Sequence, residues 1–469
     1  MDLLTRLRDI TGTQGVLTTP SDIAPFLIDH RRLYQGAARA VVLPTSTEQV
    51  SAVVRMCHDA NTSVVPQGGN TSYCGGATPD ASGRSIVLAL TRMNRILQVD
   101  ATNFALTAQA GCTLANVQAA AAAVDRLFPL SLGSEGSCQI GGNLATNAGG
   151  TAVLRYGMMR DLTLGIEAVL ADGSVYSDLS PLTKNNTGYN LKHLLIGSEG
   201  TLGVITAACL KLFPASRSTA TAWVSLPSAD AAVQLLARLR QGSGDRLSGC
   251  ELVPAAALDL VLEHIPNVRN PGATVAPWYL LAELTSSADE RLDELLMGIL
   301  SGAIEEAMAQ DAVLAQSEEQ RQNLWTLRES VPAAQRIAGA SLKHDVSVPV
   351  ASIPQLIERG GRLAAELVPE GFLIAYGHAG DGNLHFNVNQ RVGTSTADFL
   401  AREPVLKRAI HDLVASLHGS ISAEHGTGQL KVAELARYAP PAQLAAMRAI
   451  KRALDPRGIL NPGKLLIAE

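Results

Sequence analysis

"VVPQGGNTSYCGG", residues 64–76, joins a short run of β-branched residues to a loop that is rich in glycine. Glycine lets the backbone approach a ligand closely, and consecutive N–H groups in such a turn form a nest that binds anions. The hydroxyl groups of Thr71 and Ser72 add hydrogen-bond donors. Taken alone, the same residues also suit an ordinary tight turn. The stretch therefore predicts a ligand-binding loop only if the rest of the chain supports that reading.

Two further loops of the same texture follow, "LGSEGSCQIGGNLATNAGGTAVLRYG" at 132–157 and "IGSEGTLGVIT" at 196–206. None of the three is a GxGxxG that opens a helix or a GxxxxGK[ST] phosphate loop. A nicotinamide-binding Rossmann domain and a nucleoside triphosphatase are therefore disfavoured. Three polar glycine loops so close together favour a large ligand that carries phosphate.

The composition indicates a globular protein of more than one domain. With 469 residues, 46% hydrophobic and 17% charged, the chain is too long for one small core. The net charge is −5, and dispersed Lys and Arg argue against nucleic-acid binding and against docking on anionic membranes. No apolar run reaches the length of a membrane span. Six cysteines without CxxC spacing indicate reduced thiols in a cytoplasmic protein, with peripheral membrane association left open.

The texture of the chain changes twice. Residues 1–214 mix short strands and helices with glycine loops, as in an α+β domain. Residues 215–415 alternate long helices with strands, which predicts a second sheet covered by helices. Residues 416–469 hold a glycine-rich segment, a helix and the closing "RGILNPGKLL".

"YGHAGDGNLHFNV", residues 376–388, contains two histidines seven residues apart. If Asp381-Gly382 forms a two-residue type I′ turn, His378 lies directly opposite His385. Opposed residues have Cβ atoms about 4.5–5.5 Å apart, close enough for two imidazoles to share one metal ion. Opposed histidines at a sheet surface can also simply be solvated, and the hairpin alone leaves that alternative open.

Alternation along this hairpin separates polar from apolar side chains. Period two places Tyr376 and Asn387 on the face of the histidines, whereas Phe386 and Val388 point to the core. A distant stretch, "AEHGTG" at 423–428, supplies Glu424. Two imidazoles and a carboxylate with an open position are the usual composition of a catalytic zinc site, and manganese or iron also suits these ligands. Asp381 and Asn387 are candidates to orient the imidazoles.

A specific resemblance lies in the glycine loops. "PQGGNTS", "GGNLATNAGG" and "GSEGTLGVIT", in this order and spacing, resemble the flavin domain of the vanillyl-alcohol oxidase/p-cresol methylhydroxylase superfamily, and "DPRGILNPGK" resembles its closing segment. The resemblance implies a two-subdomain FAD-binding domain over 1–214. It further implies an α+β substrate (cap) domain with an antiparallel sheet over 215–415, and a C-terminal segment, 416–469, that returns to the flavin and completes the metal and flavin site.

The same resemblance implies a set of FAD-binding residues. These are Pro66, Gly68, Gly69, Asn70, Thr71, Ser72, Ser134, Gly142, Asn143, Thr146, Asn147, Gly149, Ile205 and Asn461. The glycine, asparagine and hydroxyl residues from 68 to 72 would hold the pyrophosphate. Family members with covalent flavin often carry a histidine where this chain has Asn70, which predicts non-covalent FAD. Cys138 is the alternative, a cysteinyl link to the flavin.

The histidine motifs, with "LRESV" at 327–331 and "SLKHDVSVP" at 341–349, are similar to the metal-dependent D-2-hydroxyacid dehydrogenase branch of this superfamily. The resemblance implies the metal ligands His378, His385 and Glu424. It implies the substrate-binding residues Arg328, Lys343, Asn387 and His425, with His425 also the catalytic base. The strand after Lys343 favours a buried position for that lysine.

The chemistry implied is oxidation of a D-2-hydroxy acid, with hydride passing to flavin N5. A metal that binds the α-hydroxyl acidifies it, and His425 takes the proton. No haem, iron–sulfur or nicotinamide motif is present, so an electron-transfer flavoprotein or a quinone is the expected acceptor. A homodimer is a further expectation.

The expected substrate is D-2-hydroxyglutarate. The branch that uses this diacid tends to have a hydroxyl residue four positions after the arginine, where this chain has Pro332. D-lactate, glycolate or another D-2-hydroxy acid therefore stays open. A metallohydrolase that uses the His–His–Glu site is a more distant alternative, which leaves the glycine loops without a purpose. A flavin-binding module without catalysis leaves Arg328, Lys343 and His425 without one.

Overall fold

The computed structural model describes residues 2–272 and 274–467. The chain divides into two compact units. The first unit comprises Met1–Gly150, Gly157–Ala215 and Glu424–Glu469, and the second comprises Thr151–Tyr156 and Ser216–Ala423. The first division lies one residue after the predicted boundary at 214/215. The second lies eight residues after the predicted 415/416, because α15 (Glu403–Ser416) is continuous there and Ser420 still pairs with Ser347 of the second unit.

The first unit contains two main sheets. The four-stranded sheet has the order β1-β2-β4-β3 and is parallel except for β1. Its strands are β1 (Val16–Leu17), β2 (Ala40–Val42), β3 (Val64–Gln67) and β4 (Ile86–Ala89). The five-stranded sheet is antiparallel, with the order β5-β6-β10-β8-β9. Its strands are β5 (Ile96–Asp100), β6 (Ala105–Gln109), β8 (Thr163–Val169), β9 (Val175–Asp178) and β10 (Val204–Lys211).

Helices and short connections complete the first unit. The helices are α1 (Leu3–Thr11), α2 (Pro20–Ile23), α3 (Thr47–Asp59), α4 (Leu114–Ala122), α5 (Ile140–Ala145), α7 (Lys192–Leu195), α16 (Val432–Tyr438) and α17 (Pro441–Leu454). A two-stranded ladder joins β7 (Arg126–Leu127) to β11 (Phe213–Pro214). The start of α3 follows from its sequence, because the Ser46 hydroxyl accepts a hydrogen bond from Gln49 N. The apolar residues of α3 then pack on the parallel sheet in one core with Ile86 and Leu88.

One eight-stranded antiparallel sheet forms the centre of the second unit. Its order is β15-β12-β14-β13-β18-β19-β16, and β17 pairs with β19 as well. The strands are β12 (Ser218–Leu226), β13 (Leu247–Pro254), β14 (Trp278–Ser286), β15 (Asp311–Leu314), β16 (Ser341–Leu342), β17 (Asp345–Ser347), β18 (Gly371–His378) and β19 (Asn383–Gln390). The predicted antiparallel sheet is thus confirmed.

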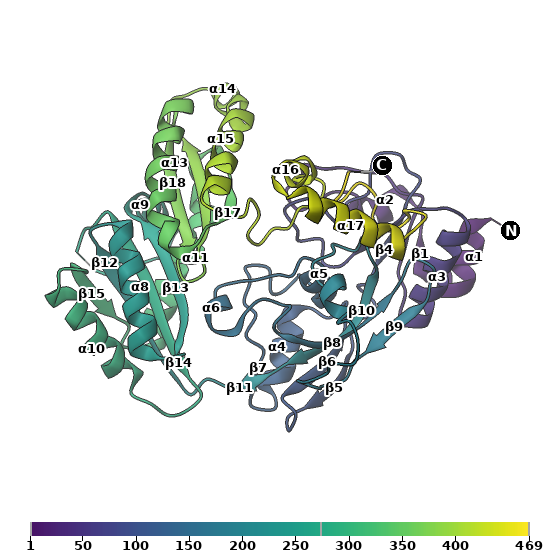
Figure 1. Cartoon of the computed structure of the whole chain (residues 1–469), viewed down its shortest axis with the longest axis horizontal. Coiled ribbons are helices and arrows are strands. Elements are labelled where there is room, and N and C mark those ends of the chain that lie inside the picture. The colour runs from purple at the N-terminus through teal and green to yellow at the C-terminus, as the bar shows by residue number, and fades with distance from the viewer. Residues whose placement is uncertain (1, 273, 468–469) are drawn as a thin grey trace. The chain divides into compact units, whose positions relative to one another are not determined.

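Helices cover both faces of this sheet (Figure 1). One face packs on α8 (Ala229–Ser243), α10 (Leu292–Glu305), α13 (Ile353–Leu367) and α15, with α14 (Thr396–Ala401) beside α15. The other face packs on α9 (Ala255–His264), α11 (Glu318–Glu329) and α12 (Val331–Ala338). The short α6 (Val153–Tyr156) contacts β13. Because strand side chains alternate between faces, Phe386 belongs to the first core whereas Tyr376 belongs to the second.

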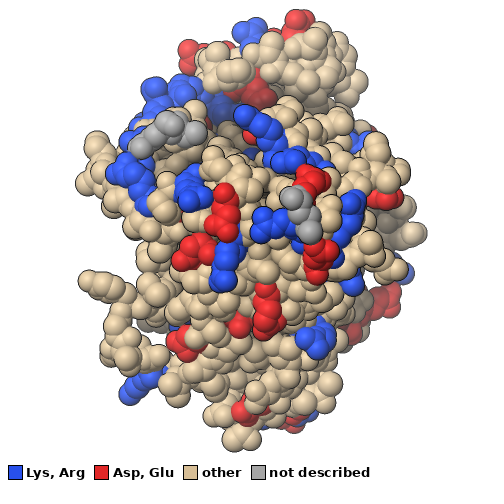
Figure 2. All heavy atoms as spheres, turned by 90° about the vertical axis from the view of Figure 1, so that its right-hand side faces the viewer, with Lys and Arg blue, Asp and Glu red and all other residues tan. Residues whose placement is uncertain are grey.

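The charged surface, the helices and the cysteines can be compared with the predictions made from composition. Basic and acidic side chains are interspersed on the face drawn in Figure 2. In the part of the chain that the structure describes, no helix combines the length and apolar character that a membrane span requires. All six cysteines are buried thiols.

Candidate active site

The histidine hairpin differs in register from the sequence prediction. In the ladder between β18 and β19, His378 pairs with Asn383, and Tyr376 pairs with His385. The connection is a four-residue loop, 379–382, and not a two-residue turn. The prediction that the two histidines lie directly opposite each other is therefore wrong.

The longer loop is held by hydrogen bonds that the sequence pattern does not reveal. The N–H of Gly382 donates to the carbonyl of His378 (3.2 Å), and the carboxylate of Asp381 accepts from the N–H of Asn383 (3.0 Å). The side chain of Asn383 in turn donates to the carboxylate of Asp345 on β17 (3.0 Å). Asn383 is thereby held as a strand residue, which moves the start of β19 and sets the register.

The two histidines nevertheless share one face of the sheet. The register differs from the predicted one by two residues, and a shift of two preserves the side of each side chain. The imidazole centroids of His378 and His385 are 5.8 Å apart, and one nitrogen of each ring lies within 4.8 Å of the other. Phe386 and Val388 are buried in the core on the opposite face, as predicted. The hairpin thus brings together the two predicted imidazole ligands.

Glu251 on β13 is the residue that sequence reasoning missed. Its side chain is fully buried, and its two oxygens have different partners. Oε1 accepts a hydrogen bond from Nδ1 of His378 (2.7 Å), and Oε2 accepts one from Nε of Arg328 (2.7 Å). Glu251 is the one charged residue in the strand "LSGCELVP", of which every residue is buried. A charged residue at a core position in a strand was the signal that could have identified it.

The electrostatics of this cluster follow from its cations. Burial alone would raise the pKa of Glu251, because it disfavours the charged carboxylate. The charges of His378 and Arg328 and their hydrogen bonds outweigh burial and lower the pKa to about 2. Glu251 is therefore ionised at neutral pH. Because an ionised carboxylate only accepts hydrogen bonds, Nδ1 of His378 carries a hydrogen, and Nε2 is the nitrogen that suits a metal.

Arg328 lies near the end of α11 and is buried, with 7% of its side chain exposed. Its guanidinium carbon lies 4.9 Å from the ring centroid of Tyr376, and this ring is 5.0 Å from that of His385. The ion pair with Glu251 and the contact with the aromatic ring hold the guanidinium in place. Pro332 occupies the first turn of α12, which begins two residues after α11 ends.

Lys343 is exposed, so the expected burial of this lysine is wrong. It lies between β16 and β17, and its neighbours His344 and Asp345 are the buried residues of this segment. Nδ1 of His344 bonds to the backbone carbonyl of Phe386 (2.8 Å). The strand that follows Lys343 thus buries the two residues after the lysine and leaves the lysine on the surface.

Asn387 is buried and joins β19 to two other elements. Its carbonyl oxygen accepts from the N–H of His344 (3.3 Å), and its amide donates to the side chain of Gln335 on α12 (3.1 Å). Glu251, and not Asn387, is the partner that orients the imidazole of His378.

The three glycine loops converge within the first unit. A Cβ atom on Gly69 would lie 2.1 Å from the carbonyl oxygen of Ser137, so the first loop meets the second at a point where only glycine fits. The third loop joins the second where the N–H of Glu199 donates to the carbonyl of Ala145 (2.8 Å). Gly200 of the third loop also packs on Pro66 of the first. The order of these loops along the chain predicted one shared site, and the fold brings them together.

The C-terminal segment returns to these loops, as predicted. The N–H of Asn461 donates to the carbonyl of Val64 on β3 (2.8 Å). Its side-chain amide donates to the carbonyls of Gly76 (2.9 Å) and Glu199 (2.7 Å). The side chain of Asn461 thereby connects the first loop to the third through two short hydrogen bonds.

The loops fit a large polar ligand. A Cβ atom on Gly142 would meet open space, so the second loop leaves room beside its backbone. Among the described residues, Oε1 of Gln139 and Oδ1 of Asn461 are buried acceptors without a hydrogen-bond partner. Buried polar atoms are rarely left unsatisfied, and a flavin nucleotide with its donors and phosphates suits both features.

The other predicted FAD-binding residues differ in exposure. Those partly exposed are Pro66, Gly68, Gly69, Asn70, Thr71, Ser72, Ser134, Gly142, Thr146 and Asn147. Those buried are Asn143, Gly149, Ile205 and Asn461. The amide of Asn143 points to the sulfur of Cys138, which is 3.6 Å away and 2% exposed.

A second buried carboxylate, Glu199, anchors the loop that carries His425. Its oxygens accept hydrogen bonds from the backbone N–H groups of Thr427 (2.7 Å) and Gly428 (2.6 Å). Burial raises the pKa of Glu199 against the opposing effect of these bonds. The imidazole of His425 meets the ring of Tyr73 edge-on, with centroids 4.7 Å apart. The predicted catalytic base is therefore held beside the first glycine loop.

Glu424 directly follows Ala423, where the second unit ends. Four residues earlier in the chain, Ser420 pairs with Ser347 of β17, and β17 pairs Asp345 with His385. A span of four residues covers at most about 14 Å. Glu424 therefore follows four residues after a segment that pairs with the strand beside His385.

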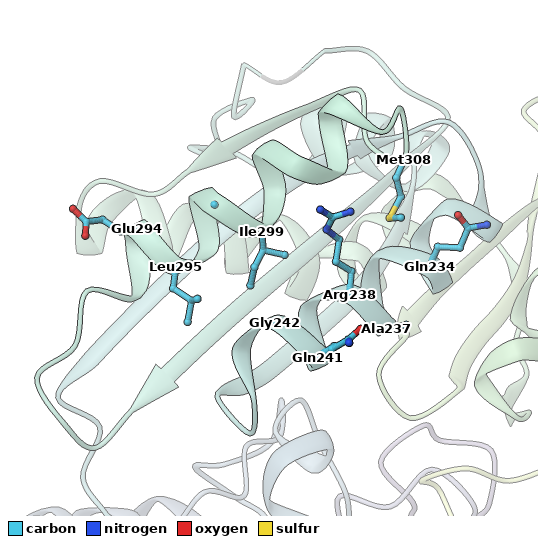
Figure 3. Close-up of a pocket in the computed structure, with 10 residues that line it drawn as sticks. Gln234, Ala237, Arg238, Gln241, Gly242, Glu294, Leu295, Ile299 and Met308 are labelled. Atoms are coloured by element: carbon cyan, nitrogen blue, oxygen red, sulfur yellow. The ribbon is translucent and has the colours of Figure 1, made fainter.

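A groove of about 740 Å³ lies elsewhere in the second unit, between α8 and α10 (Figure 3). Gln234, Arg238, Glu294 and Met308 are among the residues that line it. It contains none of the predicted site residues.

Comparison with protein families matches both parts of the chain. Residues 38–178 match the model described as "FAD binding domain", and residues 215–465 match "FAD linked oxidases, C-terminal domain".

Similar proteins cover nearly the whole chain. D-2-hydroxyglutarate dehydrogenase of Bos taurus mitochondria is 39% identical, over 96% of this chain and 81% of the relative. D-2-hydroxyglutarate dehydrogenase of Xanthomonas citri pv. viticola is 37% identical, over 96% of this chain and 93% of the relative. The crystal structure of p-cresol methylhydroxylase with substrate bound superposes with a TM-score of 0.77 at 18% identity, covering 99% and 96% of the two chains. The predicted fold class and family resemblance are confirmed.

Proposed function

We propose that this chain, which belongs to the family of FAD-linked oxidases, is a metal-dependent dehydrogenase that oxidises D-2-hydroxyglutarate to the 2-oxo acid. The observation that carries the proposal is the buried cluster of the second unit, in which Arg328 lies beside the imidazole pair. A guanidinium suits a substrate carboxylate, and two imidazoles suit a divalent cation. The full-length relatives named D-2-hydroxyglutarate dehydrogenases support the choice of substrate.

The cofactors follow from the residues that would hold them. The glycine loops would hold FAD non-covalently, which the buried position of Cys138 supports. His378, His385 and Glu424 would hold the cation, zinc in our proposal, with manganese or iron as alternatives. When bound, FAD supplies N5 as the hydride acceptor, and the cation supplies Lewis acidity that makes the α-hydroxyl a stronger acid.

The chain's own side chains bind the acid and move its proton. Arg328 binds a carboxylate through planar N–H groups, whereas Lys343, exposed and flexible, contributes a point charge. Asn387 lies on the same sheet face and adds a polar contact. His425 accepts the hydroxyl proton, because imidazole is the side chain whose neutral form is populated near pH 7. The α-hydrogen leaves with its electron pair as hydride, and the hydroxyl carbon becomes the carbonyl of the 2-oxo acid.

The identity of the acid is the finer part of the proposal. A diacid requires a second cationic or hydrogen-bonding group in addition to Arg328, and Lys343 is the candidate. Pro332 lacks a donor where relatives of this branch tend to have a hydroxyl group. D-lactate and glycolate, which have one carboxylate, are therefore the competing substrates on the same machinery.

Turnover with bound FAD would require an external electron acceptor, which we propose to be an electron-transfer flavoprotein or a quinone. We further propose a homodimer located in the cytoplasm. The six buried thiols support the cytoplasmic location, because reduced cysteines are typical of that compartment.

An anaerobic flavin-bleaching screen tests the proposal. Purified holoenzyme is mixed with D-2-hydroxyglutarate, its L enantiomer, D-lactate and glycolate, and the flavin absorbance is followed. Bleaching by D-2-hydroxyglutarate at the lowest concentration is the expected result. Bleaching by D-lactate or glycolate alone transfers the assignment to a sibling dehydrogenase. A flavin that dithionite bleaches but none of the acids does would contradict the proposal.

A pair of arginine variants tests whether Arg328 binds the substrate carboxylate. Arg328→Lys is expected to raise KM, because a lysine cannot reproduce a planar two-pronged contact. Arg321→Lys is the matched control, since Arg321 lies on the same helix and also pairs with a glutamate of the sheet, Glu283. Equal KM values for the two variants would remove Arg328 from the substrate site.

A further inference from the structure

We propose that Glu251 is a positioning residue that couples metal binding to substrate binding. Its carboxylate holds the imidazole of His378 with one oxygen and the guanidinium of Arg328 with the other. The inference rests on the proposed function, in which His378 is a metal ligand and Arg328 binds the substrate carboxylate. It adds a residue that touches neither the cation nor the acid.

The first argument is the burial of all three groups. Glu251 is 0% exposed, Arg328 is 6% exposed and His378 is 7% exposed. Their partners are 77 and 127 residues away from Glu251 in the chain, so only the tertiary fold assembles them. Water competes little for hydrogen bonds at such a depth, which makes each 2.7 Å contact a strong constraint on orientation.

The second argument is the rigidity of the two strands that carry Glu251 and His378. Glu251 and His378 are direct partners in the ladder between β13 and β18. Both residues lie on central strands of the eight-stranded sheet. A carboxylate on a central strand places its acceptor atoms more reproducibly than one on a loop.

The third argument is what each hydrogen bond dictates to its donor. Because Nδ1 of His378 must donate to Glu251, the tautomer and the plane of the imidazole are set, and Nε2 is assigned to the metal. Because Nε of Arg328 donates to the other oxygen, the guanidinium plane is set by this bond and by the Tyr376 ring 4.9 Å away. A displacement of Glu251 therefore disturbs both binding groups together.

The sheet contains a natural control in Glu283 on the adjacent strand β14. Its Oε2 accepts hydrogen bonds from Arg321 (3.2 Å) and from Nε1 of Trp325 (2.7 Å), both on α11. Glu283 thus resembles Glu251 in joining the sheet to an arginine of the same helix. It holds no proposed metal ligand and no proposed substrate-binding group.

The decisive variant is Glu251→Gln, which keeps the size of the side chain. A glutamine has one acceptor oxygen and one NH₂ donor, so it cannot accept from both His378 and Arg328. If NH₂ faces His378, the imidazole must become an acceptor at Nδ1, and Nε2 then carries the hydrogen. If NH₂ faces Arg328, two donors oppose each other. Either arrangement disturbs one of the two binding groups.

Two readouts are measured on the full-length protein with FAD bound. Zinc affinity is measured by competition with a chromophoric chelator on metal-depleted protein, and KM and kcat are measured with D-2-hydroxyglutarate. Glu251→Gln is expected to weaken zinc binding by about 10–100-fold, the effect typical of losing a carboxylate that orients a ligating histidine. KM is expected to rise as well. Glu251→Asp, which restores the charge at a shorter reach, is expected to recover part of both losses.

Glu283→Gln supplies the structural control. It is expected to lower the melting temperature while leaving zinc affinity and KM unchanged. Flavin content and melting temperature establish that each variant is folded, and Glu251→Asp carries the test if Glu251→Gln does not fold. Unchanged zinc affinity together with unchanged KM in a folded Glu251 variant would overturn the inference.

The design separates failure of this inference from failure of the proposed function. If wild-type protein reduces its flavin with none of the acids, the proposed function fails. The zinc measurement needs no substrate, and it still reports whether Glu251 orients His378. If wild-type protein is active but Glu251→Gln changes only its melting temperature, the inference fails and the proposed function stands.

Discussion

Glu199 and Glu251 are both buried carboxylates, one in each compact unit, yet their pKa values shift in opposite directions. Glu199 accepts hydrogen bonds from two uncharged backbone N–H groups, and burial raises its pKa. Glu251 is buried more completely, but the charges of His378 and Arg328 lower its pKa to about 2. Burial alone therefore does not decide whether a carboxylate is destabilised; the charge of its partners does.

The contrast extends to the way in which each unit builds its part of the site. The first unit relies on backbone groups of the glycine loops, and Glu199 and Asn461 hold those loops through N–H and carbonyl groups. The second unit relies on side-chain charges arranged on the rigid strands of a sheet. Substitutions in the first unit should therefore change the backbone conformation of a loop. Substitutions in the second unit should change the charge of a side chain or the tautomer of an imidazole.

Removal of the metal is expected to have the largest effect, and it distinguishes the proposed role of the second unit from that of the first. Dialysis against a chelator is expected to abolish turnover while FAD stays bound, because both proposed imidazole ligands belong to the second unit and the glycine loops to the first. The check is the flavin absorbance of the dialysed protein together with its rate before and after zinc or manganese is restored. Full activity in a metal-free preparation would remove the Lewis-acid role.

His425→Ala tests the base that the first unit holds. We expect the rate of flavin reduction at saturating substrate to fall by about 10²–10⁴-fold, the usual contribution of general base catalysis. Substrate affinity should change little, because Arg328 and Lys343 are intact. Stopped-flow reduction at several substrate concentrations separates the two quantities. His58→Ala, on α3 of the first unit, is the control, and a reduction rate equal to that of the control rules out His425 as the base.

Glu199→Ala tests whether the hydrogen bonds from backbone N–H groups to Glu199 anchor the loop that carries His425. It leaves the N–H groups of Thr427 and Gly428 without their acceptor, which should lower the free energy of unfolding by about 1–3 kcal/mol. Because these residues lie two and three positions after His425 in the same loop, flavin reduction should slow as well. Glu199→Gln retains one acceptor oxygen and should show a smaller loss. Thermal unfolding and stopped-flow reduction provide the measurements, and a variant with wild-type values in both would contradict the anchoring role.

The pH dependence of stability is the smallest effect and has opposite signs at the two carboxylates. The folded pKa of Glu251 is lowered from its ordinary value of 4.5, so its contribution is present above 4.5 and is lost as the pH falls toward about 2. The folded pKa of Glu199 is raised, so its contribution is present below 4.5 and is lost as the pH rises through the folded pKa.

Melting temperatures between about pH 2 and pH 7 measure both effects against variants that cannot titrate. The destabilisation caused by Glu251→Gln should be largest near neutral pH and should shrink as the pH falls. Relative to Glu199→Gln, wild-type protein should lose stability as the pH rises. Curves that run parallel in both comparisons would show that neither carboxylate has a shifted pKa.

The sequence predicted the glycine-loop site for a local reason. A loop such as 64–76 taken alone also suits a tight turn, but three such loops in this order resemble those of one superfamily. The return of Asn461 to the loops was predicted from the closing motif in the same way. These features depend on residue types that are adjacent in the chain.

The hairpin shows where local reasoning fails. Asp381-Gly382 is a favoured two-residue turn, but Asn383 is held by Asp345 from another strand, and this long-range contact selects a four-residue loop. The shared face of His378 and His385 was still predicted correctly, because a register shift of two preserves the side of a strand on which each residue lies.

By itself, the sequence determined the flavin-type loops, the two α+β domains and the candidate ligands. Each of these is a pattern of residues that lie close together in the chain. Only the tertiary structure decided that Glu251 joins His378 to Arg328 and that Glu199 anchors the His425 loop. The physical reason is that a buried carboxylate takes its role from its partners. Those partners lie 77, 127 and 228 residues away, where no local pattern can reveal them.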